Sequence, residues 1–432
     1  MPDLAISNGA VLPIDGKGTV IPDGFVAVDG DRISEIGVGK PPAADRTIDA
    51  RGGIIMPGLV NAHTHAAMTL FRGLADDLPL MDWLNNHIFP AEATYITPEA
   101  VYWGQTLACA EMIRSGTTCY CDMYYFEDEG ARASRDAGVR AVLGEALIDF
   151  PGPDQRDVTE RLERNEQLCK EWADDPLIYA SVQPHAPYTC SAEVISRAKE
   201  IADRYDVAFK IHLSETAGEV EQIQAEHGVT PVGLLAKLGV LDSRVLCAHA
   251  VHLTDADIRL LAESGAGVVH CPESNMKLAA GVAPVSKLLL AGVTVGLGTD
   301  GCASNNNLNM LGEMTTAALL HKVANSDPTV MDARTVVAMA TRGSARGLGL
   351  GDEIGTLEAG KRADVIVIDT DSPNMVPLYN EFSHLVYATN GSEVRTVVIG
   401  GRTVMEDFEM LTIDVEKASA EVRAIARKVG GV

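Results

Sequence analysis

Two histidines, His63 and His65, close an apolar run near the start of the chain. Side chains at positions i and i+2 of a strand point to the same face, so both imidazoles can reach one metal ion. Three further metal-ligand side chains stand at the ends of later apolar runs, namely His212, His249 and Asp300. Imidazole nitrogens and a carboxylate suit a borderline divalent cation, which favours zinc and leaves iron as the alternative. The five residues therefore predict a metal site.

The elements that must bring these residues together are short apolar runs, which alternate with longer amphipathic stretches from residue 58 to about residue 346. Repeated strand–helix units of this kind favour a parallel sheet, and eight of them are typical of an α/β fold, the (β/α)₈ or TIM barrel. The expected strands are 59–65, 117–123, 140–147, 178–185, 208–213, 244–250, 267–271 and 294–299. Chemistry in such barrels sits at the carboxyl ends of the strands, where each candidate ligand falls.

The two ends of the chain have a different pattern, with short alternating segments broken by Gly and Asp turns. We expect residues 1–57 and 354–432 to combine into one small antiparallel domain, a β-sandwich beside the barrel, with an amphipathic helix over 415–429. The catalytic barrel would then span residues 58–353.

Charge and hydropathy exclude several classes of partner. The chain has 35 basic and 60 acidic residues, and its net charge of −25 repels nucleic acid and anionic lipid surfaces. We find no uncharged apolar stretch of about 18 or more residues, and the amino terminus lacks the basic region of a secretion signal. The eight cysteines are scattered through apolar segments, as buried thiols are. We therefore expect a cytoplasmic protein with neither a nucleic-acid nor a membrane partner.

The number of metal ions is indicated by the fourth expected strand. The commonest binuclear arrangement requires a modified lysine at the end of that strand, and this chain has His185 there, within Gln183-Pro-His-Ala-Pro-Tyr188. The sequence thus favours one divalent ion.

With these residues in view, the chain resembles the amidohydrolase superfamily, and specifically its 5-methylthioadenosine/S-adenosylhomocysteine deaminase group, which includes 5'-deoxyadenosine deaminases. The resemblance covers essentially the whole length. The segments that carry it are Met56-Pro-Gly-Leu-Val-Asn-Ala-His-Thr-His65, Ser115-Gly-Thr-Thr118, Gln183-Pro-His-Ala-Pro-Tyr188, His212-Leu-Ser-Glu-Thr216, Cys271-Pro-Glu-Ser-Asn-Met-Lys-Leu278, Gly298-Thr-Asp-Gly301, Ser304-Asn-Asn-Asn307 and Gly360-Lys-Arg-Ala-Asp-Val365.

The resemblance implies a set of roles for the candidate residues. The metal ligands would be His63, His65, His212 and Asp300. A bound zinc ion lowers the pKa of water to about 7 and so supplies hydroxide at neutral pH. Glu215 would protonate a purine ring nitrogen as hydroxide attacks, His249 would orient the attacking water, and Asp300 would also accept a proton. The products would be ammonia and the inosine analogue.

Substrate contacts are expected from the long stretch after the first strand, residues 72–98, which has the composition of a lid over the barrel mouth. In the family, a glutamate that matches Glu92 binds the two ribose hydroxyls, and His185 resembles a sugar-contacting histidine. Trp83 either packs on the ligand or fills the core of the lid. Glu215 and Asp300 would contact the substrate as well. The resemblance also implies a homo-oligomer.

Two positions bear on the substituent at the 5' carbon of the sugar. Where many family members have an arginine at the end of the third strand, this chain has Glu145, and a carboxylate in a pocket disfavours an anionic group. The hypothesis is that neutral 5'-modified adenosines are better substrates than S-adenosylhomocysteine, whose tail carries a carboxylate. Arg161 is either a second substrate-binding arginine or a surface residue of the following helix.

Two alternatives remain open at this point. Related enzymes with the same metal site hydrolyse triazines or deaminate guanine-like bases, but Glu92, His185 and Glu215 together favour a small-molecule nucleoside. A non-catalytic scaffold on the same barrel would be expected to have lost metal ligands, and this chain retains the whole set.

Overall fold

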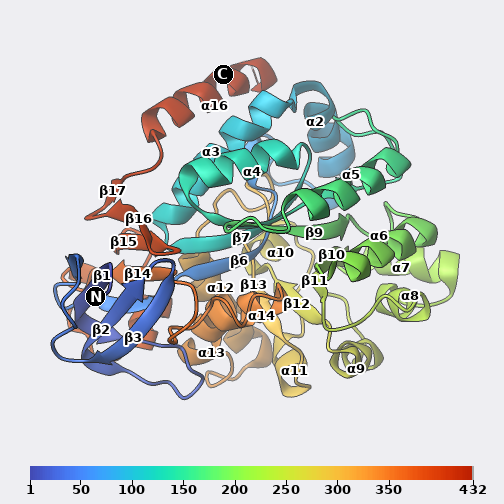
Figure 1. The fold of residues 1–432 in the computed structure, drawn as a ribbon. Helices are drawn as coiled ribbons and strands as arrows, with labels where there is room; N and C mark the ends of the chain where they lie inside the picture. The colour runs from blue at the N-terminus through green and yellow to red at the C-terminus, as the bar shows by residue number, and fades with distance from the viewer. Residues whose placement is uncertain (431–432) are drawn as a thin grey trace.

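A parallel eight-stranded barrel forms the centre of the molecule (Figure 1), in a computed structural model that describes residues 1–430. The strands are hydrogen-bonded to one another in chain order, from the first to the last. They are β6 (Leu59–Thr64), β7 (Thr117–Tyr124), β8 (Arg140–Leu147), β9 (Ile178–Pro184), β10 (Ala208–Leu213), β11 (Val245–His249), β12 (Gly267–His270) and β13 (Val295–Leu297). The predicted (β/α)₈ barrel is confirmed, and each expected strand coincides with one of these.

The barrel closes where β13 approaches β6. The Asp300 amide donates a hydrogen bond of 3.0 Å to the His63 carbonyl oxygen. A glycine is required at this contact, because a Cβ atom on Gly298 would lie 2.8 Å from the His63 nitrogen and 2.9 Å from its Cβ. Two metal-ligand candidates at opposite ends of the barrel sequence are thereby brought together.

Helices cover the outside of the barrel (Figure 1). Many begin at a capping side chain, such as Ser191, Thr216 and Thr254, and end at a glycine in the left-handed conformation, such as Gly228 and Gly265. The helices of the barrel region are α3 (Pro98–Arg114), α4 (Glu127–Ala137), α5 (Val158–Glu171), α6 (Ala192–Tyr205), α7 (Ala217–His227), α8 (Pro231–Lys237), α9 (Asp255–Ser264), α10 (Pro272–Lys277), α11 (Val285–Leu290), α12 (Met310–Asn325), α13 (Ala333–Ala338) and α14 (Ser344–Gly347), with the π-helical turn η3 (Met339–Gly343) between the last two.

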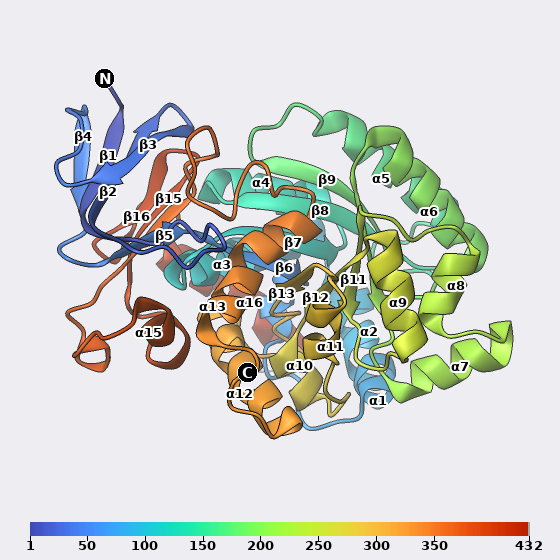
Figure 2. The ribbon, with the colours of Figure 1, turned by 90° about the horizontal axis from the view of Figure 1, so that it is seen from below.

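Both ends of the chain contribute to a second, nine-stranded sheet beside the barrel (Figure 2). Its strands are β1 (Leu4–Val11), β2 (Ile21–Asp29), β3 (Arg32–Val38), β4 (Arg46–Asp49), β5 (Ile54–Pro57), β14 (Val365–Ile368), β15 (Val394–Ile399), β16 (Arg402–Glu406) and β17 (Glu409–Met410). The amino-terminal and carboxyl-terminal strands join where β5 pairs with β14. The sheet is mixed where the sequence predicted an antiparallel one, because β1 pairs in parallel with both β4 and β5.

Short helices follow β6 and cover the mouth of the barrel, as expected for the lid. They are η1 (Ala66–Phe71), α1 (Leu80–Trp83), η2 (Leu84–Ile88) and α2 (Phe89–Tyr95). The terminal helix α16 (Val415–Gly430) lies near α3 and α2 (Figure 1), and α15 (Glu381–Tyr387) precedes β15. No helix within residues 1–430 has both the length and the apolar character needed to cross a bilayer.

Candidate active site

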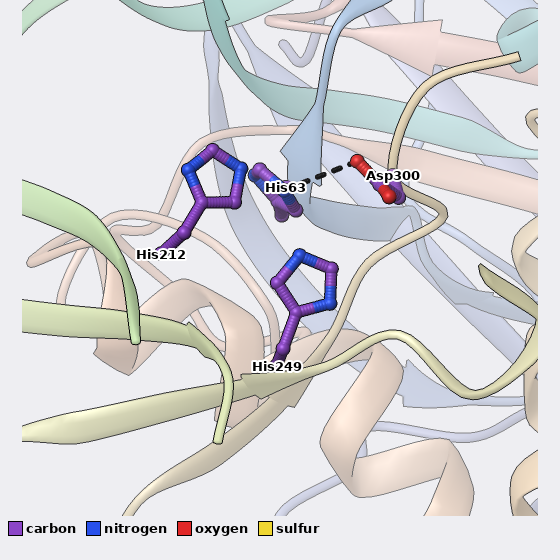
Figure 3. Close-up of side chains that lie close together, drawn as sticks. All are labelled: His63, His212, His249 and Asp300. Atoms are coloured by element: carbon purple, nitrogen blue, oxygen red, sulfur yellow. Dashed lines mark ion pairs between the residues drawn. The ribbon is translucent and has the colours of Figure 1, made fainter. Parts of the chain in front are cut away.

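The candidate metal ligands converge at the carboxyl ends of the barrel strands. His63, His212, His249 and Asp300 each offer a ligand atom, and these atoms all lie within 4.8 Å of one another (Figure 3). They come from β6, β10 and β11 and from the residues after β13. All four side chains are buried.

His65 completes the cluster. Its Nε2 atom lies 3.2 Å from His212 Nε2 and 3.3 Å from Asp300 Oδ1. His63 Nε2 is also 3.3 Å from Asp300 Oδ1, so one carboxylate oxygen faces two imidazoles. The sequence-predicted ligands are therefore brought together, and His249 has a ligand atom within 4.8 Å of those of His63, His212 and Asp300.

The hydrogen bonds of the imidazoles show which nitrogen is free to bind a cation. The Nδ1 atoms of His65 and His212 lie 2.7 and 2.6 Å from the carbonyl oxygens of Met123 and His185. A carbonyl oxygen only accepts, so Nδ1 carries the proton and Nε2 of a neutral ring presents a lone pair. Two such lone pairs facing each other at 3.2 Å repel unless a cation lies between them.

His63 gives further support for a cation at this position. Neither of its ring nitrogens has a hydrogen-bond partner, although the side chain is fully buried. A buried polar atom without a partner costs free energy, and a metal ion would satisfy it. Burial lowers the pKa of His63 and of His212 well below the usual range, so both imidazoles are in the neutral form that binds metals.

Asp300 is held in its ionised form. Burial raises its pKa, but the interaction with His63, whose Nε2 atom is 3.3 Å from Oδ1, outweighs this effect and holds the pKa well below its usual range. Its Oδ2 atom accepts hydrogen bonds of 2.7 Å from the hydroxyls of Ser274 and Ser304, which leaves Oδ1 toward the imidazoles. The residues present thus fit a divalent cation with nitrogen and oxygen ligands.

Glu215 is buried beside this cluster, with its Oε2 atom 4.0 Å from His249 Nε2. Burial raises the pKa of Glu215 above its usual range, which favours its protonated form over that of an exposed carboxyl group. His249 is oriented by its Nδ1 atom, which lies 2.9 Å from Asn275 Oδ1. A buried carboxyl group and an oriented imidazole can exchange protons with a substrate held between them.

Sequence reasoning missed Glu219, which shapes the loop that carries Glu215. Its carboxylate accepts hydrogen bonds of 2.8 Å from the amides of Ser214 and Glu215, and burial raises its pKa to about 7. The signal was present, because Thr216 caps α7 and Glu219 stands three residues later, as in a capping box. Ser214 has φ of 53°, a left-handed conformation that these two hydrogen bonds hold in place.

A cavity of about 680 Å³, including space open to solvent, adjoins the cluster, and residues of the lid helices form part of its wall. Trp83, Glu92 and His185, all expected to contact substrate, line this cavity together with Glu215 and Asp300. Most of the remaining wall is apolar or aromatic, with Met68, Leu80, Leu84, Phe89, Met123, Tyr124, Tyr125, Ile148, Tyr188 and Leu278. No lysine or arginine within residues 1–430 lines it.

Glu92 and His185 have strongly shifted protonation equilibria. Burial raises the pKa of Glu92 to about 7, against the opposing effect of the Tyr124 hydroxyl. Burial lowers the pKa of His185 to about 3, so this imidazole is neutral. Its Nδ1 atom lies 2.9 Å from the Thr189 hydroxyl, which fixes the orientation of the ring.

Glu145 and Arg161, the two positions expected to bear on the 5' substituent, lie outside the cavity wall, and their role in substrate binding stays a prediction. Neither residue lines the cavity; on β8 it is the neighbouring Ala146 that does. Since side chains alternate along a strand, Glu145 points to the opposite face, where its carboxylate accepts a 2.6 Å hydrogen bond from Arg156. Arg161 is fully buried and is held by Asp154 and by the carbonyl oxygens of Ile148 and Phe150.

A barrel with imidazole and carboxylate ligands at the carboxyl ends of its strands defines a metal-dependent hydrolase of the TIM-barrel class. The model of the amidohydrolase family matches residues 54–404. This chain belongs to the amidohydrolase family, and it is a metal-dependent hydrolytic deaminase.

Similar proteins span the full length of the chain. A 5-methylthioadenosine/S-adenosylhomocysteine deaminase from Syntrophobacter fumaroxidans is 54% identical, with 99% of this chain and 98% of the relative covered. A 5'-deoxyadenosine deaminase from Methanosarcina mazei is 45% identical, with 99% of each chain covered. The crystal structure of a zinc-bound adenosine deaminase from Xanthomonas campestris is 42% identical and superimposes with a TM-score of 0.97 over 100% of this chain and 99% of the other.

Proposed function

We propose that this protein hydrolyses 5'-modified adenosines to the corresponding inosine analogues and ammonia, with one zinc ion. The observation that carries this proposal is one cavity that holds the metal-ligand cluster, the buried acid Glu215 and the buried acid Glu92. The cluster and Glu215 supply hydrolysis, and Glu92 supplies a contact for a sugar. Relatives named for deamination of methylthioadenosine, S-adenosylhomocysteine and deoxyadenosine support the nucleoside assignment.

The ion would be held by the four residues whose ligand atoms face one another, His63, His65, His212 and Asp300. When bound, zinc supplies hydroxide at neutral pH by lowering the pKa of a water molecule. The zinc-bound adenosine deaminase structure supports this choice of metal, as do the nitrogen and oxygen donors. In this assignment, His249 orients the attacking water and does not serve as a fifth ligand.

The chain's own residues then move the protons. Asp300 accepts a proton from the attacking water, and Glu215 gives its proton to the purine ring nitrogen next to the amino-bearing carbon. A new C–O bond forms at that carbon. The C–N bond to the amino group breaks, and ammonia leaves with the proton that Asp300 took from the water. The new hydroxyl group then gives its proton to Glu215, which restores the acid and leaves the carbonyl group of the inosine analogue. The raised pKa of Glu215 suits a group that must start in its protonated form.

The sugar would be recognised opposite the metal cluster. A carboxylate only accepts hydrogen bonds, so ionised Glu92 can accept both ribose hydroxyls. Neutral His185 can donate to or accept from the sugar, and the indole of Trp83 adds apolar contact. A triazine or a free base would leave buried Glu92 without a partner, which disfavours these alternatives.

The substituent at the 5' carbon would be neutral and small. The cavity has no lysine or arginine among the described residues, so the carboxylate of a homocysteine tail would be buried without a cation. This argument replaces the one from Glu145, whose carboxylate is paired with Arg156 outside the cavity. Methylthioadenosine and 5'-deoxyadenosine are thus expected to be better substrates than S-adenosylhomocysteine.

An ammonia-release assay on zinc-loaded protein tests the proposal. The substrates are adenosine, its 5'-deoxy, 5'-methylthio and homocysteinyl derivatives, guanine and a chlorotriazine. We expect the highest kcat/KM for the two neutral derivatives, a lower value for S-adenosylhomocysteine, and no turnover of guanine or the triazine. Absence of activity on every nucleoside would overturn the function, whereas a clear preference for S-adenosylhomocysteine would overturn only the specificity.

A further inference from the structure

A second cavity lies at the opposite end of β13 from Asp300. Thr294 and Val295, at the amino end of that strand, form part of its wall, and its volume, including space open to solvent, is about 1130 Å³. The other walls come from α11, α13, η3, α14 and α15 and from the loop of residues 14–18 between β1 and β2. We call it the basal cavity. It lies between barrel and terminal-sheet residues and shares no lining residue with the active site.

Four basic side chains line the basal cavity. They are Lys17, Arg334, Arg342 and Arg346. No carboxylate within residues 1–430 lies within the 4.0 Å ion-pair distance of any of them. In contrast, the buried arginines Arg140 and Arg161 are each paired with an aspartate.

The one acidic residue in the wall of the basal cavity is already engaged. Asp332 caps α13 by accepting a 2.9 Å hydrogen bond from the Thr335 amide. Capping leaves Asp332 its negative charge, and Asp15 beside Lys17 adds a second carboxylate, so the four basic side chains outnumber these acids. An anion that contacts several of the basic side chains reduces the repulsion that remains among them. A group of four basic side chains in one cavity wall is unusual on a chain whose net charge is −25.

The backbone is adapted to these arginines. Gly16 and Gly18 have φ angles of +85° and +73°, in the left-handed region that favours glycine. A Cβ atom at Gly16 would overlap the Arg342 guanidinium, and one at Gly18 would lie 2.9 Å from Arg334 Cζ. The loop thus passes directly over two guanidinium groups and restricts where they can move.

We propose that the basal cavity binds a small anion that carries at least two negative charges on phosphate groups. Guanidinium groups match phosphate oxygens with paired N–H donors, and three arginines with one lysine suit a diphosphate better than a single carboxylate. The ligand is either a free polyphosphate or a nucleotide. Leu289, Val293 and Phe382 provide an apolar wall that could take the organic part of a nucleotide.

Titration calorimetry with inorganic pyrophosphate, uridine diphosphate and uridine tests this site. A uridine nucleotide is chosen because it lacks the purine that the active site is proposed to bind, so the result does not depend on the proposed function. We expect both phosphate compounds to bind, uridine to bind undetectably, and affinity to fall as salt rises from about 20 to about 200 mM. Tighter binding of the nucleotide would identify the apolar wall as part of the site, and equal binding would identify the phosphates alone.

The variant Arg334→Gln/Arg342→Gln should weaken pyrophosphate binding about tenfold or more, since charge-assisted hydrogen bonds from two guanidinium groups are lost. Arg342→Lys keeps the charge but loses the paired donors, and should weaken binding less. The matched control is Arg197→Gln/Arg259→Gln, which removes the same charge from exposed arginines outside the cavity. Equal affinity of the two double variants, or no pyrophosphate binding by the wild type, would overturn the proposal.

Discussion

At the scale of single residues, burial is what gives the acids of the active site their chemical character. Glu92 and Glu215 are both acids whose pKa is raised by burial in one cavity, yet only Glu215 lies beside His249 and the metal-ligand cluster. The same physical effect therefore supports two roles. At Glu215 the raised pKa favours the protonated form that a proton donor needs, and at Glu92 it makes the strength of the hydrogen-bond acceptor depend on pH.

Replacement of the proposed acid should abolish turnover without removing the metal. Glu215→Gln keeps the size of the side chain but cannot donate a proton in the same way, so kcat should fall about 10²- to 10⁴-fold. Ammonia release and metal analysis are the two measurements. Glu221→Gln, an exposed acid of α7, is the control and should retain full activity. Loss of zinc in Glu215→Gln would instead indicate a role in the metal site.

Replacement of the proposed sugar acceptor should affect substrate binding more than the chemical step. Glu92→Gln should raise KM about 10- to 100-fold, because two hydrogen bonds to a charged group are lost. In the wild type, 1/KM should fall as the pH drops below about 7, where the Glu92 carboxylate gains its proton. The variant should lack this inflection. A KM unchanged by the substitution would remove Glu92 from the sugar site.

The gain in stability of Glu92→Gln over the wild type should increase with pH. The pKa of Glu92 rises from 4.5 to about 7 on folding, so the folded state loses stability as the pH increases through this window. Glu92→Gln removes that penalty, and its Tm should exceed that of the wild type by about 2 to 4 °C at pH 8. At pH 5 the gain should be smaller, and Glu99→Gln, an exposed acid, should show neither effect.

At the scale of elements, the position of His63 depends on how closely β13 approaches β6. Gly298→Ala would place a methyl group 2.8 Å from the His63 backbone nitrogen, so the two segments must move apart. We expect a destabilisation of about 1 to 3 kcal/mol from overpacking, and zinc affinity lower by about 10- to 100-fold, as for residues that orient metal ligands. Denaturant unfolding and competition with a chelator measure the two effects.

Gly218→Ala is the matched control for Gly298→Ala. Gly218 lies in the first turn of α7, where a Cβ atom would meet nothing closer than the Thr216 hydroxyl at 3.9 Å. Alanine is the better helix former, so this variant should be as stable as the wild type or more so. A zinc affinity in Gly298→Ala equal to that of the control would show that His63 tolerates the displacement.

At the scale of the whole molecule, a buried ion pair joins the barrel to the terminal sheet. Arg140, at the start of β8, donates hydrogen bonds of 2.9 and 3.0 Å to the two carboxylate oxygens of Asp364, just before β14. Both side chains are at most 3% exposed. Asp364 also accepts from the Gly400 amide, so the pair fixes the sheet against the base of the barrel.

Breaking this pair should destabilise the protein strongly while leaving the active site intact. Arg140→Met leaves the Asp364 carboxylate buried without its cation, at a cost of about 3 to 5 kcal/mol. Arg140→Met/Asp364→Asn should recover part of this loss. Urea unfolding measures stability, and kcat of the folded fraction should not change. Lys287→Gln breaks an exposed pair with Asp255 and should cost at most about 1 kcal/mol. Equal losses in the two single variants would contradict the argument.

The sequence alone determined the barrel, its eight strands and the metal-ligand candidates. This was possible because strand periodicity and the position of polar residues at strand ends are local properties, visible at His63, His65 and His212. The tighter cluster with His249 and the tautomers fixed by Met123 and His185 follow only from contacts between strands. The domain boundaries and the homo-oligomer stay predictions.

The tertiary structure alone decided which face of a strand each side chain occupies at the edge of the site. In the sequence, Glu145 stands near the end of a barrel strand. In the structure, the side chain of Glu145 on β8 contacts Arg156, and the neighbouring Ala146 lines the cavity. Because side chains alternate along a strand, a shift of one residue moves a side chain from the face that lines the cavity to the opposite face. The basal cavity is equally invisible in the sequence, since its basic residues come from segments more than 300 positions apart, as Lys17 and Arg334 do.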